Sequence, residues 1–82
     1  MTRKDLLSEI NEKLEEENAN NVISENEALV ASGVDSFGLT MTLVDISNKY
    51  DIYPKEEFRN INFQKITAKE VIDKIMSKHE NN

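Results

Sequence analysis

Apolar residues recur every three or four positions in three segments of this 82-residue chain. This spacing places each set on one face of an α-helix, whereas a half-buried strand would alternate strictly. A chain of this length builds one core, so we expect the three apolar faces to pack together. The residues expected in this core are Leu6, Leu7, Ile10 and Leu14, then Leu39, Leu43, Ile46 and Tyr50, and finally Ala68, Val71, Ile72, Ile75 and Met76.

Start and stop signals give the ends of these helices. Thr2 with Asp5, and Thr67 with Glu70, have the spacing of a capping box, in which two side chains satisfy free N–H groups at a helix start. Pro54 lacks a backbone N–H, so the middle helix must end before it. The predicted helices cover residues 1–18, 36–51 and 67–78.

Two connections of different character join the helices. Residues 21–35 form a long loop, which we expect Val22, Ile23, Leu29 and Val30 to tether to the core. Residues 55–66 are predicted to hold a short helical turn and a loop. The expected anchors of that segment are Phe58, Ile61, Phe63 and Ile66. The expected fold is all-α, a small four-helix bundle with three main helices, a short third helix and a long loop between helices one and two.

Composition excludes several classes of function. The chain has no Cys, and His79 is its single His, expected to be solvated in a frayed tail, so a His triad or a Cys/His metal cluster is excluded. The net charge of −6 makes nucleic acid and anionic membranes poor partners. The sequence has no apolar run of membrane-spanning length and no apolar signal segment. We expect one cytoplasmic, monomeric domain over residues 1–82, too small for a roomy enzyme cleft and without catalytic activity of its own.

Ser36 begins the middle helix, within the stretch Gly33-Val34-Asp35-Ser36-Phe37. A serine at this place usually does no more than cap the helix. If Asp35 is the N-cap, however, Ser36 is the first helical residue and its hydroxyl is free. Because a helix start carries unpaired N–H groups and partial positive charge, a phosphate ester on Ser36 would lie in a favourable field. Gly33 allows the unusual backbone conformation needed before this junction.

The middle helix carries a second apolar stripe of Phe37, Met41 and Val44, roughly opposite the buried one. Between the stripes we predict a polar strip. Its residues are Gly38, Thr42, Asp45 and Lys49. A helix at the surface of a small domain cannot easily bury two stripes. The second stripe is therefore either extra core contact with the long loop or an exposed recognition patch beside Ser36.

Taken together, the chain resembles the acyl carrier protein family over nearly its whole length. Gly33-Val34-Asp35-Ser36-Phe37 is similar to the family's Gly-x-Asp-Ser-Leu, and Tyr50-Asp51-Ile52 with Pro54 is similar to the aromatic-Asp-Ile and proline that end its second helix. The resemblance implies phosphopantetheine esterified to Ser36 by a separate phosphopantetheinyl transferase that uses coenzyme A, with Asp35 helping to position the site. The thiol of this arm would hold an acyl or aminoacyl group as a thioester and present it to partner enzymes.

The chain departs from typical fatty-acid carriers in its second helix, where the family places acidic residues for basic docking patches. Only Asp45 remains acidic in the helix interior. The neighbouring positions hold Gly38, Met41, Ser47, Asn48 and Lys49. We therefore expect partners to dock on Phe37, Met41 and Val44, beside Asp45, with weak salt dependence.

The cargo stays open between an acyl group and an amino acid. Residues 57–66 are longer than the matching part of typical fatty-acid carriers and are more similar to stand-alone carriers of aminoacyl or specialised acyl pathways. Expected partners are a loading ligase and downstream synthase or transferase enzymes. Candidates to line a cavity for the cargo, or simply core, are Val44, Phe58, Ile61, Val71 and Ile72. A different class of function also fits these residues: an unmodified acidic helical module that binds a basic protein through the same apolar stripe.

Overall fold

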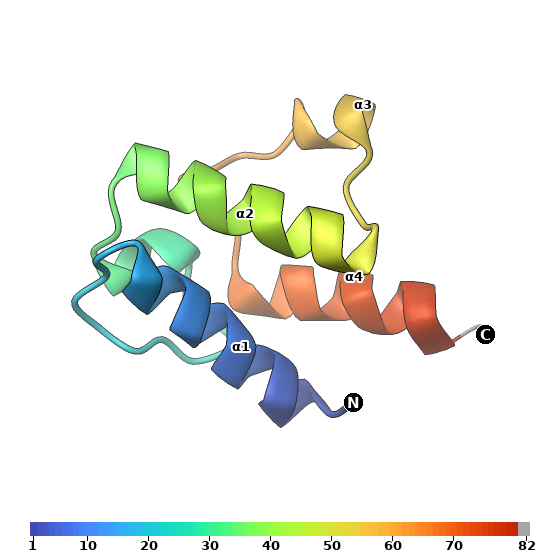
Figure 1. The fold of residues 1–82 in the computed structure, drawn as a ribbon, viewed down its shortest axis with the longest axis horizontal. Coiled ribbons are helices and arrows are strands. Elements are labelled where there is room, and N and C mark those ends of the chain that lie inside the picture. The colour runs from blue at the N-terminus through green and yellow to red at the C-terminus, as the bar shows by residue number, and fades with distance from the viewer. Residues whose placement is uncertain (81–82) are drawn as a thin grey trace.

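The computed structural model describes residues 1–80, which fold into helices joined by turns and loops (Figure 1). The elements are α1 (Arg3–Glu16), the 3-10 helix η1 (Leu29–Ser32), α2 (Ser36–Tyr50), α3 (Lys55–Phe58) and α4 (Ala68–Glu80). No strand occurs within residues 1–80, where Ala28 and Thr67 form an isolated antiparallel bridge. The prediction of an all-α chain with three main helices and a short helix before the last is confirmed.

The helix starts follow the predicted caps. Thr2 Oγ1 accepts a hydrogen bond from the backbone N–H of Asp5 at 3.1 Å, and the Asp5 carboxylate accepts one from the N–H of Thr2 at 3.4 Å. At the start of α4, Thr67 Oγ1 accepts from the N–H of Glu70 at 3.2 Å. α1 ends at Glu16, earlier than predicted, because Asn18 adopts a left-handed φ of 70° that a helix cannot contain.

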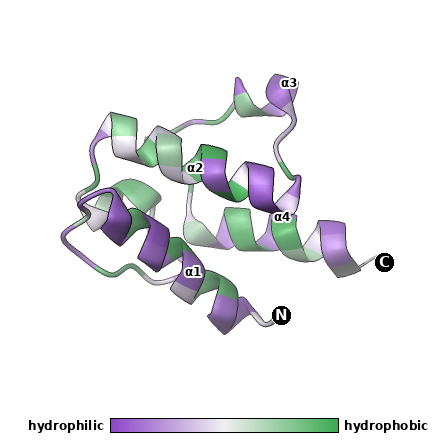
Figure 2. Cartoon of the chain, in the orientation of Figure 1, coloured by the Kyte–Doolittle hydropathy of each residue, from purple (hydrophilic) through white to green (hydrophobic). Residues whose placement is uncertain are grey.

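Three amphipathic helices form the core. Figure 1 shows that α2 and α4 run in the same direction and α1 in the opposite one, and α1 packs against both. Hydrophobic and hydrophilic residues alternate along all three helices (Figure 2). The buried apolar side chains of the helices are Leu6, Ile10 and Leu14, then Leu39, Leu43 and Ile46, and Ala68, Val71, Ile72 and Ile75. Leu7, Tyr50 and Met76 pack on this core while only partly buried. None of the described helices combines the length and apolar character of a membrane span.

The long loop forms part of the core. Ile23 and Leu29 are buried, and the side-chain amide of Asn11 holds the loop by exchanging two hydrogen bonds with the backbone of Ile23, at 2.9 and 3.0 Å. Farther along, the N–H of Leu29 donates to the carbonyl of Ile66 at 2.9 Å. The prediction that Val22 also tethers the loop is wrong: its side chain is 80% exposed, and the neighbouring Ile23 is the residue that enters the core.

Two residues of the predicted polar strip on α2 are buried instead. Gly38 and Thr42 lie on the side of α2 that meets α1, and the Thr42 side chain is 1% exposed. A Cβ on Gly38 would lie 2.6 Å from Cγ2 of Val34 and 3.0 Å from Cβ of Glu17. Residues this small let the end of α1 approach α2 closely, which the polarity pattern of α2 alone does not reveal.

His79 is also more ordered than predicted. It lies on α4 and is partly buried, with Nε2 3.2 Å from the backbone oxygen of Tyr50. Its ring meets the Tyr50 ring edge-on, with centroids 5.8 Å apart. The prediction of a solvated tail fails here because α4 continues to Glu80 and brings His79 alongside the end of α2.

We predict that Gly38→Ala destabilises the protein, although alanine favours a helix by up to about 1 kcal/mol. The new methyl group has no room against Val34 and Glu17, so α1 and α2 must separate. We expect a loss of about 1–2 kcal/mol in the free energy of unfolding, measured by urea denaturation. The matched control is Asn48→Ala, an exposed position of the same helix, which should leave stability unchanged or slightly raised. Equal effects of the two substitutions would contradict the close packing at Gly38.

Candidate functional site

The site predicted around Ser36 begins with a sharp turn at Gly33. This residue has φ 85° and ends η1, and its N–H donates to the carbonyl of Val30 at 3.0 Å. Side chains are disfavoured in this left-handed conformation, and a Cβ here would lie 3.1 Å from Nδ2 of Asn20. Glycine therefore lets the chain reverse between η1 and α2.

Ser32 fixes this turn, although the sequence did not mark it as part of the site. Its side chain is wholly buried, and Oγ donates to the carbonyl of Leu29 at 2.7 Å and accepts from the N–H of Val34 at 3.4 Å. Its carbonyl accepts from the N–H groups of Asn20 and Asn21 at 2.7 and 3.0 Å. Ser32 thus ties the segment before the site to the segment after α1. The available signal was the turn chemistry of Ser next to Gly and of paired Asn residues.

Asp35, and not Ser36, is the N-cap of α2. Its backbone is extended, with φ −79° and ψ 174°, and Oδ1 accepts from the N–H of Gly38 at 2.7 Å. The carboxylate also complements the partial positive charge of the helix start. This leaves Ser36 as the first residue of α2.

The Ser36 side chain is exposed, and its hydroxyl makes no hydrogen bond to any other residue among 1–80. The residue engages its helix only through its backbone, whose carbonyl accepts from Oγ1 of Thr40 at 2.9 Å. A hydroxyl group in this position is free for covalent modification. An ester phosphate attached there would meet the unpaired N–H groups of the first helical turn.

A surface groove of about 480 Å³ opens beside Ser36. Its lining residues are Val30, Val34, Asp35, Ser36, Leu39, Thr40, Phe63 and Gln64. One wall is the start of α2 and another comes from the loop before α4, where the Phe63 ring packs edge-on against Phe58 at a centroid distance of 5.7 Å. The groove offers apolar surface from both walls together with the polar side chains of Thr40 and Gln64. Thr40 and Gln64 were not expected at the site. Thr40 lies one helical turn after Ser36, so its place could have been read from that spacing, whereas only the tertiary fold brings Gln64 to Ser36.

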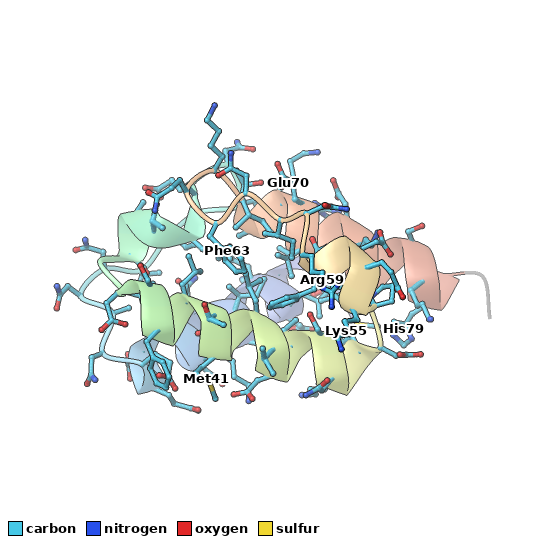
Figure 3. The ribbon with its side chains drawn as sticks, turned by 90° about the horizontal axis from the view of Figure 1, so that it is seen from above. Met41, Lys55, Arg59, Phe63, Glu70 and His79 are labelled. Carbon is cyan, nitrogen blue, oxygen red and sulfur yellow. The ribbon has the colours of Figure 1, made fainter. Side chains whose placement is uncertain are left out.

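The second stripe of α2 is on the outside of the molecule. Phe37 is 72% exposed, and Met41 and Val44 are partly buried without packing on the main core. Figure 3 shows Met41 projecting from α2 on the side away from α3 and α4. Asp45 is exposed and forms no ion pair within the described chain. Of the two interpretations of this stripe, the structure favours an exposed patch next to Ser36.

The five candidate cavity residues are not gathered around one pocket. Val71 and Ile72 are wholly buried in the core, whereas Val44 lies on the outer side of α2. Ile61 lines a different surface groove, between α3 and the start of α4. None of the five lines the groove beside Ser36, so that groove, and not a cavity among these residues, is the space next to the hydroxyl.

Residues 1–80 contain no group of three or more His, Cys, Asp or Glu side chains placed to hold a metal ion. No protein-family model, curated protein or solved structure matches the chain. Any function must therefore be inferred from its own residues.

We predict that Asp35→Ala lowers the free energy of unfolding by about 1 kcal/mol, because the N–H of Gly38 loses its partner at the helix start. Asp45→Ala is the matched control: it removes the same charge from an exposed position of α2 without a structural contact and should change stability little. Thermal unfolding of both variants checks this. A loss as large for Asp45→Ala would mean that net charge, and not the cap, is responsible.

Proposed function

We propose that this protein is a carrier of the acyl carrier type, which bears phosphopantetheine on Ser36 and holds acyl intermediates as thioesters for partner enzymes. The observation that carries the proposal is the exposed, unpaired hydroxyl of Ser36 on the first turn of α2, with the neighbouring Asp35 occupied as the cap. A serine that caps a helix accepts a hydrogen bond from a free backbone N–H with its own side-chain oxygen. Here Asp35 caps the helix, and the Ser36 hydroxyl forms no hydrogen bond within the described chain.

Loading would use coenzyme A and a separate phosphopantetheinyl transferase. The Ser36 oxygen attacks the phosphorus that bears pantetheine, the pyrophosphate bond breaks, 3′,5′-ADP leaves, and the serine proton passes to the transferase or to solvent. The exposure of Ser36 gives the transferase access to this oxygen. Since the chain has no Cys, the thiol that holds the cargo would come from the arm.

The groove beside Ser36 supports this proposal because its lining suits such an arm. Pantetheine alternates amide groups with apolar methyl and methylene groups, and the groove combines Leu39 and Phe63 with the polar side chains of Thr40 and Gln64. An arm attached to Ser36 can reach this groove without crossing the molecule. A tethered cargo would also meet each partner at a high effective concentration.

Partner enzymes, namely the transferase, a loading ligase and downstream synthases or transferases, would dock on Phe37, Met41 and Val44, beside Asp45. The exposure of Phe37 supports this assignment, because a ring that is 72% exposed offers apolar surface that a partner can bury. The cargo stays open between acyl and aminoacyl groups. The mass of the thioester cargo released from protein made in its native host would separate the two.

We predict that incubation with coenzyme A and a broad-specificity phosphopantetheinyl transferase adds one phosphopantetheine to the parent protein and none to Ser36→Ala. Intact mass spectrometry measures the gain. Because the Ser36 hydroxyl has no intramolecular partner, Ser36→Ala should keep the circular dichroism spectrum and stability of the parent. Ser24→Ala, which removes another exposed hydroxyl, should still be modified.

Failure of the folded parent to gain mass, while the same transferase modifies another carrier, would overturn the proposal. The exposed stripe of α2 would then favour the alternative function, an unmodified module that binds a protein. In that case Ser36→Ala should leave binding intact.

A further inference from the structure

The loop before α4 forms one wall of the groove beside the proposed attachment site, and a tight turn holds this wall in place. The side-chain oxygen of Asn62 accepts a hydrogen bond from the backbone N–H of Gln64 at 3.1 Å. The carbonyl of Asn62 accepts from the N–H groups of Lys65 and Ile66 at 3.0 and 2.9 Å. The carbonyl of Ile66 in turn accepts from the N–H of Leu29 at 2.9 Å, so the turn is bonded to the segment that precedes α2.

Two side chains of this turn, Phe63 and Gln64, line the groove. The Phe63 ring is partly buried and packs edge-on against Phe58. The Gln64 side chain is exposed, and its amide makes no hydrogen bond to the rest of the described chain. Both the NH2 group and the oxygen of this amide are therefore available to a ligand in the groove.

Thr40 lines the same groove from the wall that α2 forms. Its Oγ1 donates a hydrogen bond to the carbonyl of Ser36 at 2.9 Å. A hydroxyl oxygen that has donated its proton can still accept a hydrogen bond, so Thr40 offers the groove an acceptor. The groove therefore has an acceptor at Thr40 on one wall and a complete amide at Gln64 on the other.

A secondary amide is the group that suits this pair of side chains. Its N–H can donate to the oxygen of Thr40 or of Gln64, and its carbonyl can accept from the NH2 group of Gln64. The pantetheine part of the proposed arm contains secondary amides. Among the groove residues of the described chain Asp35 alone is charged, and its negative charge does not attract an arm that carries a phosphate. Hydrogen bonds and apolar contacts are therefore the interactions that this groove offers the arm.

We propose that Gln64 is a positioning residue, whose side-chain amide holds the phosphopantetheine arm in the groove by hydrogen bonding to an amide of the arm, with Thr40 as a second acceptor. This inference rests on the proposed attachment at Ser36. It adds that Gln64 keeps the arm against the protein on the side of α2 that Thr40 occupies. Met41, in the exposed stripe, follows Thr40 by about 100° around the helix. The groove that holds the arm and the docking stripe are therefore on different sides of α2.

The test uses the full chain loaded from 15N-labelled coenzyme A, with intact mass as the measure of loading. Nuclear magnetic resonance then gives the rate at which the amide hydrogens of the arm exchange with water. At least one of them should exchange about threefold more slowly than in free pantetheine, which is the protection that one hydrogen bond of ordinary net strength provides. Nuclear Overhauser effects should also connect protons of the arm with the Phe63 ring.

Substitutions assign this protection to its residues. Gln64→Leu removes the side-chain amide and should return the exchange rate to that of free pantetheine, with no change in the stability of the fold, because this amide has no partner in the described chain. Asn48→Leu is the matched control: it removes an exposed amide of α2 that does not line the groove, and it should keep the slow exchange. Thr40→Val, which removes the second acceptor, should cause a partial loss of protection.

The outcomes separate this inference from the proposed function. A parent that is loaded, but whose arm amides exchange at the rate of free pantetheine, would overturn the positioning role of Gln64 and leave the carrier proposal standing. The same conclusion would follow if Gln64→Leu and Asn48→Leu changed the exchange rate equally. A folded parent that gains no mass would overturn both proposals, because the chain would then have no arm to position.

Discussion

The arrangement of the whole chain depends on the close contact at Gly38. Its N–H is held by Asp35 at 2.7 Å, and its missing side chain makes room for Val34 from the loop and Glu17 from the end of α1. The N-cap of α2, the loop before it and the end of α1 therefore all meet at Gly38. Any shift of α1 on α2 would press on Val34, which precedes the cap, and so would move the backbone that presents Ser36.

The long loop supplies the part of the core that the helices do not. Three short amphipathic helices leave one side of the core open, and Ile23 and Leu29 close it. The backbone of this loop finds hydrogen-bond partners in the Asn11 side chain, in the carbonyl of Ile66 and in the turn around Ser32. Burying an irregular segment is stable only when its N–H and C=O groups find such partners.

The sequence predicted those features that depend on neighbours along the chain. Caps at Thr2 and Asp35 follow from local hydrogen bonds, and the core stripes follow from helical spacing. The errors concern contacts between distant segments. Gly38 and Thr42 were predicted to lie on an exposed polar strip, because nothing in the sequence of α2 shows that α1 covers them. Gln64 was not expected near Ser36, because only the path of the loop before α4 brings it to the groove. Phe63 was expected to anchor its loop to the core, but its position beside Ser36 depends on the tertiary fold.

Stability and chemistry are assigned to different residues at the start of α2. Asp35 satisfies the helix, Gly33 and Ser32 shape the approach, and the Ser36 hydroxyl contacts none of them. A group that contributes nothing to folding is one that can be modified, or can carry a large attached arm, without a change in the fold. The same separation holds for Phe37, whose exposed ring adds little to the core and, in an acidic and well-solvated chain, does not require burial for solubility. At the start of α2 the backbone is held by the Asp35 cap while the Ser36 hydroxyl has no partner in the described chain and the Phe37 ring is largely exposed, an arrangement that suits the proposed attachment of an arm beside the proposed docking face.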